Sequence, residues 1–236
     1  MEKNFTYVLP NQEVSAAVLS PVRWFMTVAL SLVLMLVTFW SLCLALYFST
    51  WQQDTAPLMK MFQDALGDIS PGRPLAHVAG IAQSMTAWLH QTLFVATGIE
   101  SMPQAPVTTH AAPFSHAIDS LLSRAAPSFH VVITATQVFG LRLAMLFGMF
   151  PLALLAYVVA FVDGNAQRAI RRACAGRESA TLYHRMKYLQ FSSLGALLIT
   201  TLCLPMHIEP LIQMTAFAVA TTLLTRTQVT YYKKYG

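Results

Sequence analysis

Charged residues are scarce in this chain of 236 residues, because Lys, Arg, Asp and Glu make up 11% of its positions while hydrophobic residues make up 56%. An ordinary soluble domain has about 25% charged residues. So few charges cannot cover the exterior of a soluble protein of this size, which excludes a disordered chain and a water-facing globular surface. The mean hydropathy is +0.53, so we expect much of the surface to face lipid.

Cysteines and catalytic motifs are also few. The three cysteines, Cys43, Cys174 and Cys203, cannot form a disulfide framework. The sequence contains no Gly-rich phosphate loop and no Ser/His/Asp arrangement, and its seven histidines show no metal-ligand spacing such as HExxH. We therefore expect no enzyme activity, no cofactor and no metal site.

Long apolar stretches are what the chain has instead. Residues 24–50 and 131–162 are each long enough to cross a hydrocarbon core of about 30 Å at about 1.5 Å per residue. The first stretch is too long for a signal sequence and lacks a following Ala-x-Ala site. Two shorter apolar stretches, 189–204 and 211–226, flank a turn at 205–210 that contains two prolines and a glutamate. The pattern predicts an all-α, polytopic inner-membrane protein with four transmembrane helices.

Arg142 is the only charged residue within 131–162. We expect its long side chain to snorkel to the outer membrane interface, because a charge in the middle of a bilayer is costly. The alternative is a buried arginine with a function. Pro151, further along this span, predicts a kink.

Small residues recur every four positions in both long spans, a spacing that lets another helix approach closely. They are Ser41, Ala45 and Ser49 in the first span, and Gly140, Ala144 and Gly148 in the second.

The distribution of Lys and Arg predicts the orientation. Residues 163–188 carry six basic and two acidic residues, whereas residues 51–130 carry three basic and five acidic ones. By the positive-inside rule, we expect the N-terminal segment 1–23, the basic elbow 163–188 and the tail 227–236 to be cytoplasmic. Residues 51–130 then form a helical periplasmic domain.

Two helices are expected in this external domain. Residues 55–67 place Leu58, Met61, Phe62, Ala65 and Leu66 on one face. Residues 74–99 lack charge but are only moderately apolar, which favours a long amphipathic helix over a fifth span. Its apolar face consists of Val78, Ile81, Met85, Trp88, Leu89 and Phe94.

The basic elbow has two competing interpretations. It is either a membrane anchor on anionic headgroups, or a structured, ion-paired elbow that docks an acidic cytoplasmic protein. We expect the second span to continue as a helix through Arg172 and the chain to turn at Gly176. The candidate interaction residues are Asp163, Gly164, Arg168, Arg171, Arg172, Gly176, Arg177, Glu178, Tyr183, His184 and Arg185.

The elbow also carries a family resemblance. Five short segments of the elbow resemble the signature of membrane proteins of integrating conjugative elements and conjugative plasmids, grouped as domain of unknown function 4400. The segments are Val162-Asp163-Gly164, Gln167-Arg168, Arg171-Arg172, Gly176 to Ser179 and Tyr183-His184-Arg185. The layout of one early span, a long external loop and three later spans is similar as well. The family has no assigned reaction, so the resemblance transfers no catalytic residues.

The resemblance implies a non-enzymatic inner-membrane scaffold of a conjugative, type IV secretion-like system that works near the coupling ATPase. Its partners would be the lipid bilayer and other membrane subunits, in a homo- or hetero-oligomer. Direct nucleic-acid binding is not expected, because headgroup attraction already explains the arginines. The alternatives are a small transporter or channel with Arg142 lining a path, and an entry-exclusion protein that uses the external loop.

Overall fold

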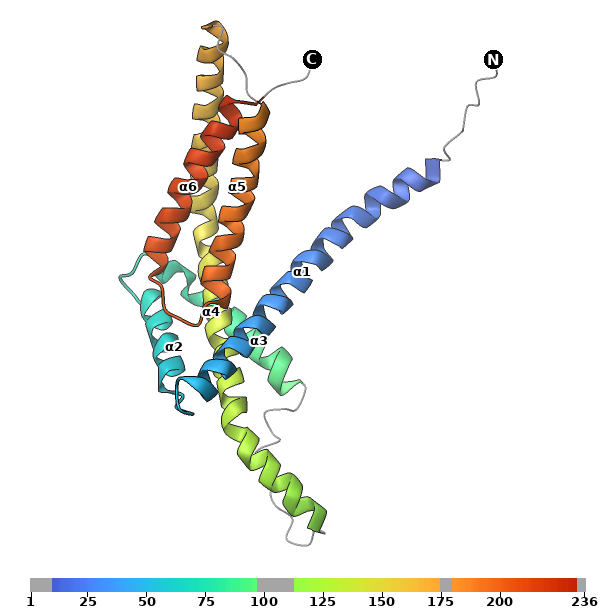
Figure 1. Ribbon diagram of the computed structural model, residues 1–236, viewed down its shortest axis with the longest axis vertical. Coiled ribbons are helices and arrows are strands. Elements are labelled where there is room, and N and C mark those ends of the chain that lie inside the picture. Colours follow the sequence, from blue (N-terminus) through green and yellow to red (C-terminus); the bar gives the residue numbers. More distant parts are fainter. Residues whose placement is uncertain (1–9, 97–112, 175–179, 233–236) are drawn as a thin grey trace.

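The computed structural model describes residues 10–96, 113–174 and 180–232, and the side chains of 21–96, 127–174 and 181–232. All regular structure in these residues is helical (Figure 1), which confirms the predicted all-α class. In chain order the elements are α1 (Pro10–Ser49), α2 (Ala56–Asp68), the short 3₁₀ turn η1 (Ala76–Val78), α3 (Ala79–His90), the π-helical turn η2 (Gln91–Val95), α4 (Pro113–Ala173), α5 (Ala180–Leu198), the π-helical turn η4 (Ile199–Cys203) and α6 (Pro210–Thr230).

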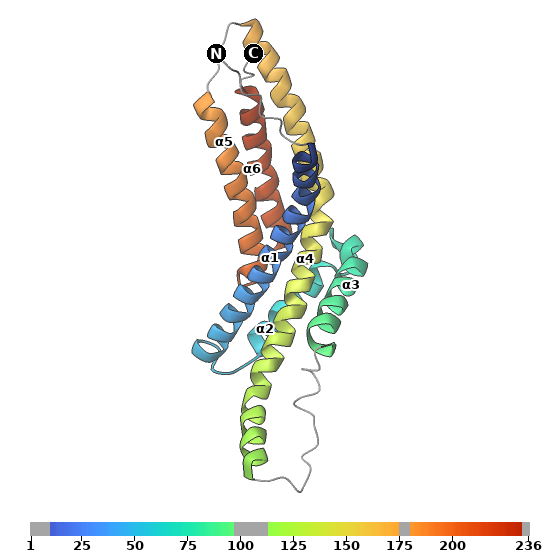
Figure 2. The ribbon, with the colours of Figure 1, turned by 90° about the vertical axis from the view of Figure 1, so that its right-hand side faces the viewer.

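The 61-residue helix α4 is the axis of the molecule. Helices α5 and α6 form an antiparallel hairpin along its C-terminal half, while α1 crosses α4 and diverges from the bundle toward its own N-terminus (Figures 1 and 2). The start of α1, the end of α4 and the end of α6 lie toward one end of the bundle. The turn between η4 and α6 lies toward the other end, beside α2.

Several helices are longer than the sequence predicts. Helix α1 already begins at Pro10, and α4 begins well before residue 131. At its other end α4 runs to Ala173, which confirms the expected continuation of the second span through Arg172. Helix α6 continues one turn past Arg226. These extensions carry helices into segments whose polar residues suggested loops or tails.

Two helical stretches are long and apolar enough to cross a membrane within the described residues. They are Pro21–Ser49 and Pro127–Ala173, with mean hydropathies of 2.4 and 2.3 over their most apolar windows. Little of either window is buried inside the protein, which gives weak support to a membrane location. Four spans are not shown, because α5 and α6 are shorter in apolar length and more polar.

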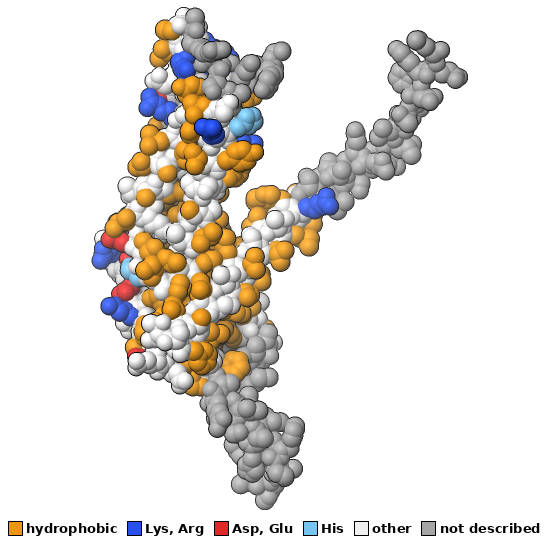
Figure 3. Space-filling view, in the orientation of Figure 1, with side chains coloured by type: hydrophobic (Ala, Val, Ile, Leu, Met, Phe, Trp, Pro, Cys, Tyr) orange, Lys and Arg blue, Asp and Glu red, His pale blue; other side chains and the backbone are white. Residues whose placement is uncertain are grey.

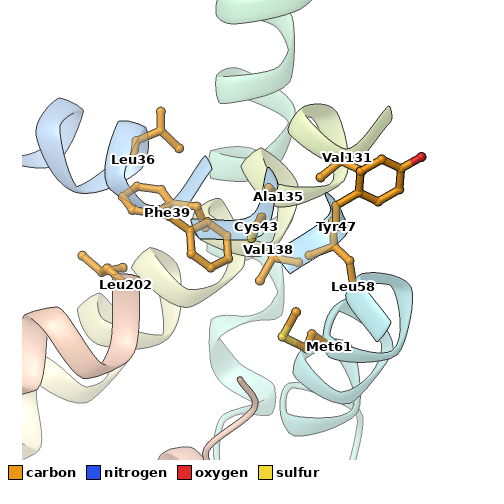
Figure 4. Packing of buried hydrophobic residues seen from close by; sticks show 11 residues of the cluster. Leu36, Phe39, Cys43, Tyr47, Leu58, Met61, Val131, Ala135, Val138 and Leu202 are labelled. Carbon is orange, nitrogen blue, oxygen red and sulfur yellow. The ribbon is translucent and has the colours of Figure 1, made fainter. Parts of the chain in front are cut away.

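The main core lies where α1, α2, α4 and η4 meet. Phe39 and Cys43 of α1, Leu58 of α2, Val138 of α4 and Leu202 of η4 are fully buried there (Figure 4). Burial of one such large apolar side chain contributes about 1.5–3 kcal/mol relative to exposure in water. Helix α2 therefore shares its core with the long helices.

The helix expected at 55–67 is confirmed by α2, with Leu58, Met61 and Ala65 buried against the bundle. The long helix expected at 74–99 is confirmed as one continuous helical stretch, in which η1, α3 and η2 follow one another over 76–95. Residues 97–99 lie outside the described part. Val78 and Phe94 of the predicted apolar face are buried, whereas Ile81 and Trp88 are 47% and 64% exposed and are not covered within this chain.

Candidate functional site

Arg142 is buried in the bundle, with 7% of its surface exposed. Its guanidinium donates hydrogen bonds to three main-chain carbonyls: from Nη1 to Thr201 (3.2 Å) and Leu204 (2.6 Å), and from Nη2 to Met206 (2.8 Å). Cζ lies 5.3 Å from the centre of the Phe39 ring of α1. Arg142 makes no ion pair with a carboxylate of the described residues. One side chain of α4 thus joins α1 to the end of the α5–η4 helix.

Pro205 explains why one of these carbonyls needs a donor from another helix. In an α-helix the carbonyl of Thr201 would accept from the N–H of residue 205, but Pro205 has no N–H. Leu204 and Met206 lie in the non-helical turn before α6, where the Leu204 carbonyl also accepts from the N–H of Met206 (2.9 Å). Terminal carbonyls buried away from water require partners, and the negative end of a helix dipole favours a cation. The guanidinium supplies both.

The expectation that Arg142 snorkels to the interface is therefore wrong. The residue does lie at the level of the turn before α6, but backbone oxygens of the protein replace water and headgroups around it.

A small cavity of about 30 Å³ lies beside Arg142, with the polar residues Asp68, His207 and Gln213 among its mostly apolar lining. Asp68 Oδ2 is buried without a hydrogen-bond partner and lies 3.8 Å from His207 Nε2. Burial raises the pKa of the Asp68 carboxyl, and the nearby His207 and Arg73 oppose that rise. The cavity has room for about one water molecule, so it is a contact between α2 and the turn rather than a substrate pocket.

A second group of polar side chains lies at the opposite end of the bundle. We call it the arginine–tyrosine cluster, and it consists of Asp163, Arg168, Arg171, Tyr183, Arg226, Tyr231 and Tyr232. Arg226 Nε lies 2.6 Å from Asp163 Oδ2. Arg168 and Arg171 stack on the rings of Tyr232 and Tyr231, with Cζ at 5.1 and 3.9 Å from the ring centres.

The cluster connects the ends of three helices. Tyr183 of α5 meets Tyr232 edge to face, with ring centres 5.4 Å apart, and also contacts His184 at 5.2 Å. Gly164 lets α6 approach α4, because a Cβ at this position would lie 2.8 Å from Val229 Cβ and 3.0 Å from the Arg226 carbonyl oxygen. A methyl group there would push the two helices apart.

The other candidate elbow residues divide into two groups. Arg172, His184 and Arg185 are exposed on the surface, whereas Gly176, Arg177 and Glu178 lie outside the described residues. Sequence reasoning missed that Arg226 of α6, together with Tyr231 and Tyr232 just after it, are the partners of the elbow. No spacing rule pairs residues about 60 positions apart.

The two small-residue stripes are placed differently. Gly140 and Ala144 are buried, and Gly140 lies against Thr86 and Leu89 of α3. A Cβ on Gly148 would overlap the Val78 side chain. By contrast, Ser41, Ala45 and Ser49 are exposed, and Ser41 and Ser49 donate hydrogen bonds to carbonyls one turn earlier in α1. The α1 stripe is thus uncovered within a single chain.

Figure 3 shows how charge is distributed on one face of the molecule. Lys and Arg gather at the end of the bundle where α6 terminates, and charges of both signs gather around α2, while the zone between carries hydrophobic and uncharged side chains. This arrangement suits a protein whose middle zone faces hydrocarbon.

Comparison with known families gives one match. Residues 74–233, more than half of the chain, match the model of a family described as IncC plasmid conjugative DNA transfer protein DtrJ-like. The match supports the conjugation-related part of the resemblance, while the name domain of unknown function 4400 is not confirmed. Neither the curated proteins nor the solved structures contain a significant match.

Proposed function

Because the chain belongs to the DtrJ-like family of conjugative DNA transfer proteins, we propose that it is a non-enzymatic inner-membrane assembly subunit of a conjugation apparatus. It acts beside the coupling ATPase of a type IV secretion-like system, with both termini in the cytoplasm. The family implies a role in conjugative DNA transfer; the scaffold role, the partners and the orientation are our proposal.

The observation that carries the proposal is the arginine–tyrosine cluster. Its internal stacks and the Asp163–Arg226 pair fix the elbow in place, which favours a structured elbow over a loose basic anchor. Next to it, Arg172, Arg185 and Lys187 are exposed. A preorganised basic surface costs less ordering entropy when it binds a partner, and acidic partners are steered to such a surface.

The direct test is charge reversal at Arg171 and Arg172 together. We expect a large loss of DNA transfer and of co-purification with the coupling ATPase, while the protein remains in the membrane fraction. The matched control reverses Lys60 and Arg73, which are two exposed basic residues on and after α2. Transfer at the wild-type frequency in the elbow variant would contradict the proposal.

A transporter or channel is the second candidate, because the buried cation of Arg142 lines a cavity that also contains Asp68 and His207. In that case Arg142→Gln would change flux into vesicles that contain the purified protein. The cavity of about 30 Å³ favours the assembly role. The entry-exclusion alternative depends largely on the external loop, whose residues 97–112 lie outside the described residues.

A further inference from the structure

An apolar groove opens where α1 diverges from the bundle. It has a volume of about 650 Å³ and is half open to the outside. Leu32 of α1, Phe150 of α4, Leu194 of α5 and Phe217 of α6 are among its lining residues. Volumes of about 300–1,000 Å³ are typical of small-molecule sites.

The dimensions of the groove favour a hydrocarbon chain as its occupant. Along α4 the lining runs from Leu143 to Tyr157, which is about 21 Å at 1.5 Å per residue. One leaflet offers about 15 Å of hydrocarbon depth to an acyl chain. An acyl chain that lies along α4 can therefore cover most of the length of the groove.

A basic residue marks one end of the groove. Gln190, Phe191 and Leu194 of α5 line it, and Lys187 precedes Gln190 by three residues and Phe191 by four, which places it on the same helix face. Lys187 is exposed. It therefore stands at the rim, at the end of the groove nearer the arginine–tyrosine cluster.

We propose that the groove binds one acyl chain of a phospholipid whose phosphate contacts Lys187. An ammonium group and a phosphate form a charge-assisted hydrogen bond, and anionic headgroups are attracted to basic residues at the cytoplasmic surface. The lipid fills the space between α1 and the bundle and fixes the angle between them. This inference depends on the membrane location proposed above and on no role in DNA transfer.

The test uses the full chain reconstituted in vesicles of phosphatidylethanolamine and phosphatidylglycerol. A trace of phosphatidylglycerol carries a photoactivatable group on one acyl chain, and the labelled fraction of protein is measured by mass spectrometry. Leu194→Trp fills the groove, and we expect it to reduce labelling at least threefold. The matched control is Leu223→Trp, since Leu223 of α6 is also exposed (56%) and does not line the groove.

A second pair of variants tests the headgroup contact. Lys187→Glu is expected to lower labelling by the phosphatidylglycerol probe, whereas Lys60→Glu makes the same charge change on α2 and leaves it unchanged. Repeating the labelling with a phosphatidylethanolamine probe shows whether net negative charge or the phosphate alone is recognised, and either result supports the site if Leu194→Trp abolishes it.

Three outcomes would overturn the inference. They are equal labelling of wild type and Leu194→Trp, labelled peptides that map away from the groove, and cross-links showing a helix of a second copy in the groove. Cell fractionation separates this inference from the proposed function. A chain absent from the membrane refutes the membrane location itself, whereas a membrane-bound chain without groove labelling refutes only the lipid site.

Discussion

The arginines at the two ends of the bundle have different environments. Arg142 is 7% exposed and is satisfied by three backbone carbonyls without a carboxylate. In the arginine–tyrosine cluster, the side chains of Arg226 and Asp163 are paired but remain 45% and 44% exposed. Loss of the donor to a buried polar group costs about 1–3 kcal/mol for each group left unpaired, whereas an exposed ion pair contributes about 0–1 kcal/mol. The first end therefore governs stability, and the second is free to serve recognition.

The largest expected effect comes from Arg142→Met, which keeps the apolar stem and removes every donor. All three carbonyls lose the guanidinium as a donor, while the Leu204 carbonyl keeps the N–H of Met206. We therefore expect a destabilisation of roughly 1–3 kcal/mol for each carbonyl left unpaired, measured as a lower thermal unfolding midpoint in detergent. Arg226→Met at the other end is the control and should lower stability by less than about 1 kcal/mol. Equal losses of stability in the two variants would contradict the idea that the Arg142 end of the bundle governs stability.

The next largest effect on stability is expected at glycines that differ in how closely another helix approaches them. At Gly148 a methyl group overlaps the Val78 side chain, whereas at Gly195 it meets nothing within 4 Å. We expect Gly148→Ala to destabilise the protein by about 1–3 kcal/mol through overpacking, and Val78→Ala to restore part of the loss. Gly195→Ala should be neutral or stabilising by up to about 1 kcal/mol, because it removes a helix-interior glycine. Thermal unfolding of Gly148→Ala, of Gly148→Ala with Val78→Ala added, and of Gly195→Ala checks the pattern.

Asp68 predicts a pH dependence at the Arg142 end. Burial raises the pKa of this carboxyl in the folded protein, so the folded state holds the proton at a pH where the unfolded state has lost it. The resulting cost is absent below the ordinary pKa of about 4, grows as the pH rises toward the raised value and is complete above it. Asp68→Asn should therefore stabilise the protein at neutral pH and leave acid stability unchanged. Unfolding midpoints across pH 3–8 test this, and a loss of stability at pH 7 would argue against it.

The smallest effect is expected at the exposed pair. A double-mutant cycle of Asp163→Asn and Arg226→Gln should give a coupling below about 1 kcal/mol that shrinks further at high salt. A coupling as large as the Arg142 effect would mean that this end is buried in the assembled protein.

Much of the fold can be predicted from the sequence, because long apolar runs and helical periodicity are local signals. They predict the apolar parts of α1 and α4, the helix at 56–68 and the hairpin around the Pro205–Pro210 turn. Periodicity does not say which face of an apolar helix is covered. For that reason the stripe on α4 meets α3, while Ser41, Ala45 and Ser49 are uncovered in one chain.

The arginine sites were harder to predict because their partners are distant or have no side-chain signature. The acceptors of Arg142 are backbone carbonyls 59 to 64 residues away. The sequence signal for this site is Pro205, which lacks the N–H that an α-helix would offer to the Thr201 carbonyl. Asp163 was expected among the elbow arginines, but its partner is Arg226 on the last helix, and only the tertiary packing of α6 on α4 brings the two together.

The long sequence separation at Arg142 also has a consequence for biogenesis. During translation at roughly 5–20 residues per second, the arginine is made several seconds before Thr201, Leu204 and Met206, which follow 59 to 64 residues later. The nascent α4 segment must keep its cation hydrated or in contact with lipid headgroups throughout that interval. When the α5–α6 hairpin docks on α4, the carbonyls of Thr201, Leu204 and Met206 replace water or headgroups around the guanidinium. Arg142 therefore reaches its final environment only after this hairpin has been made.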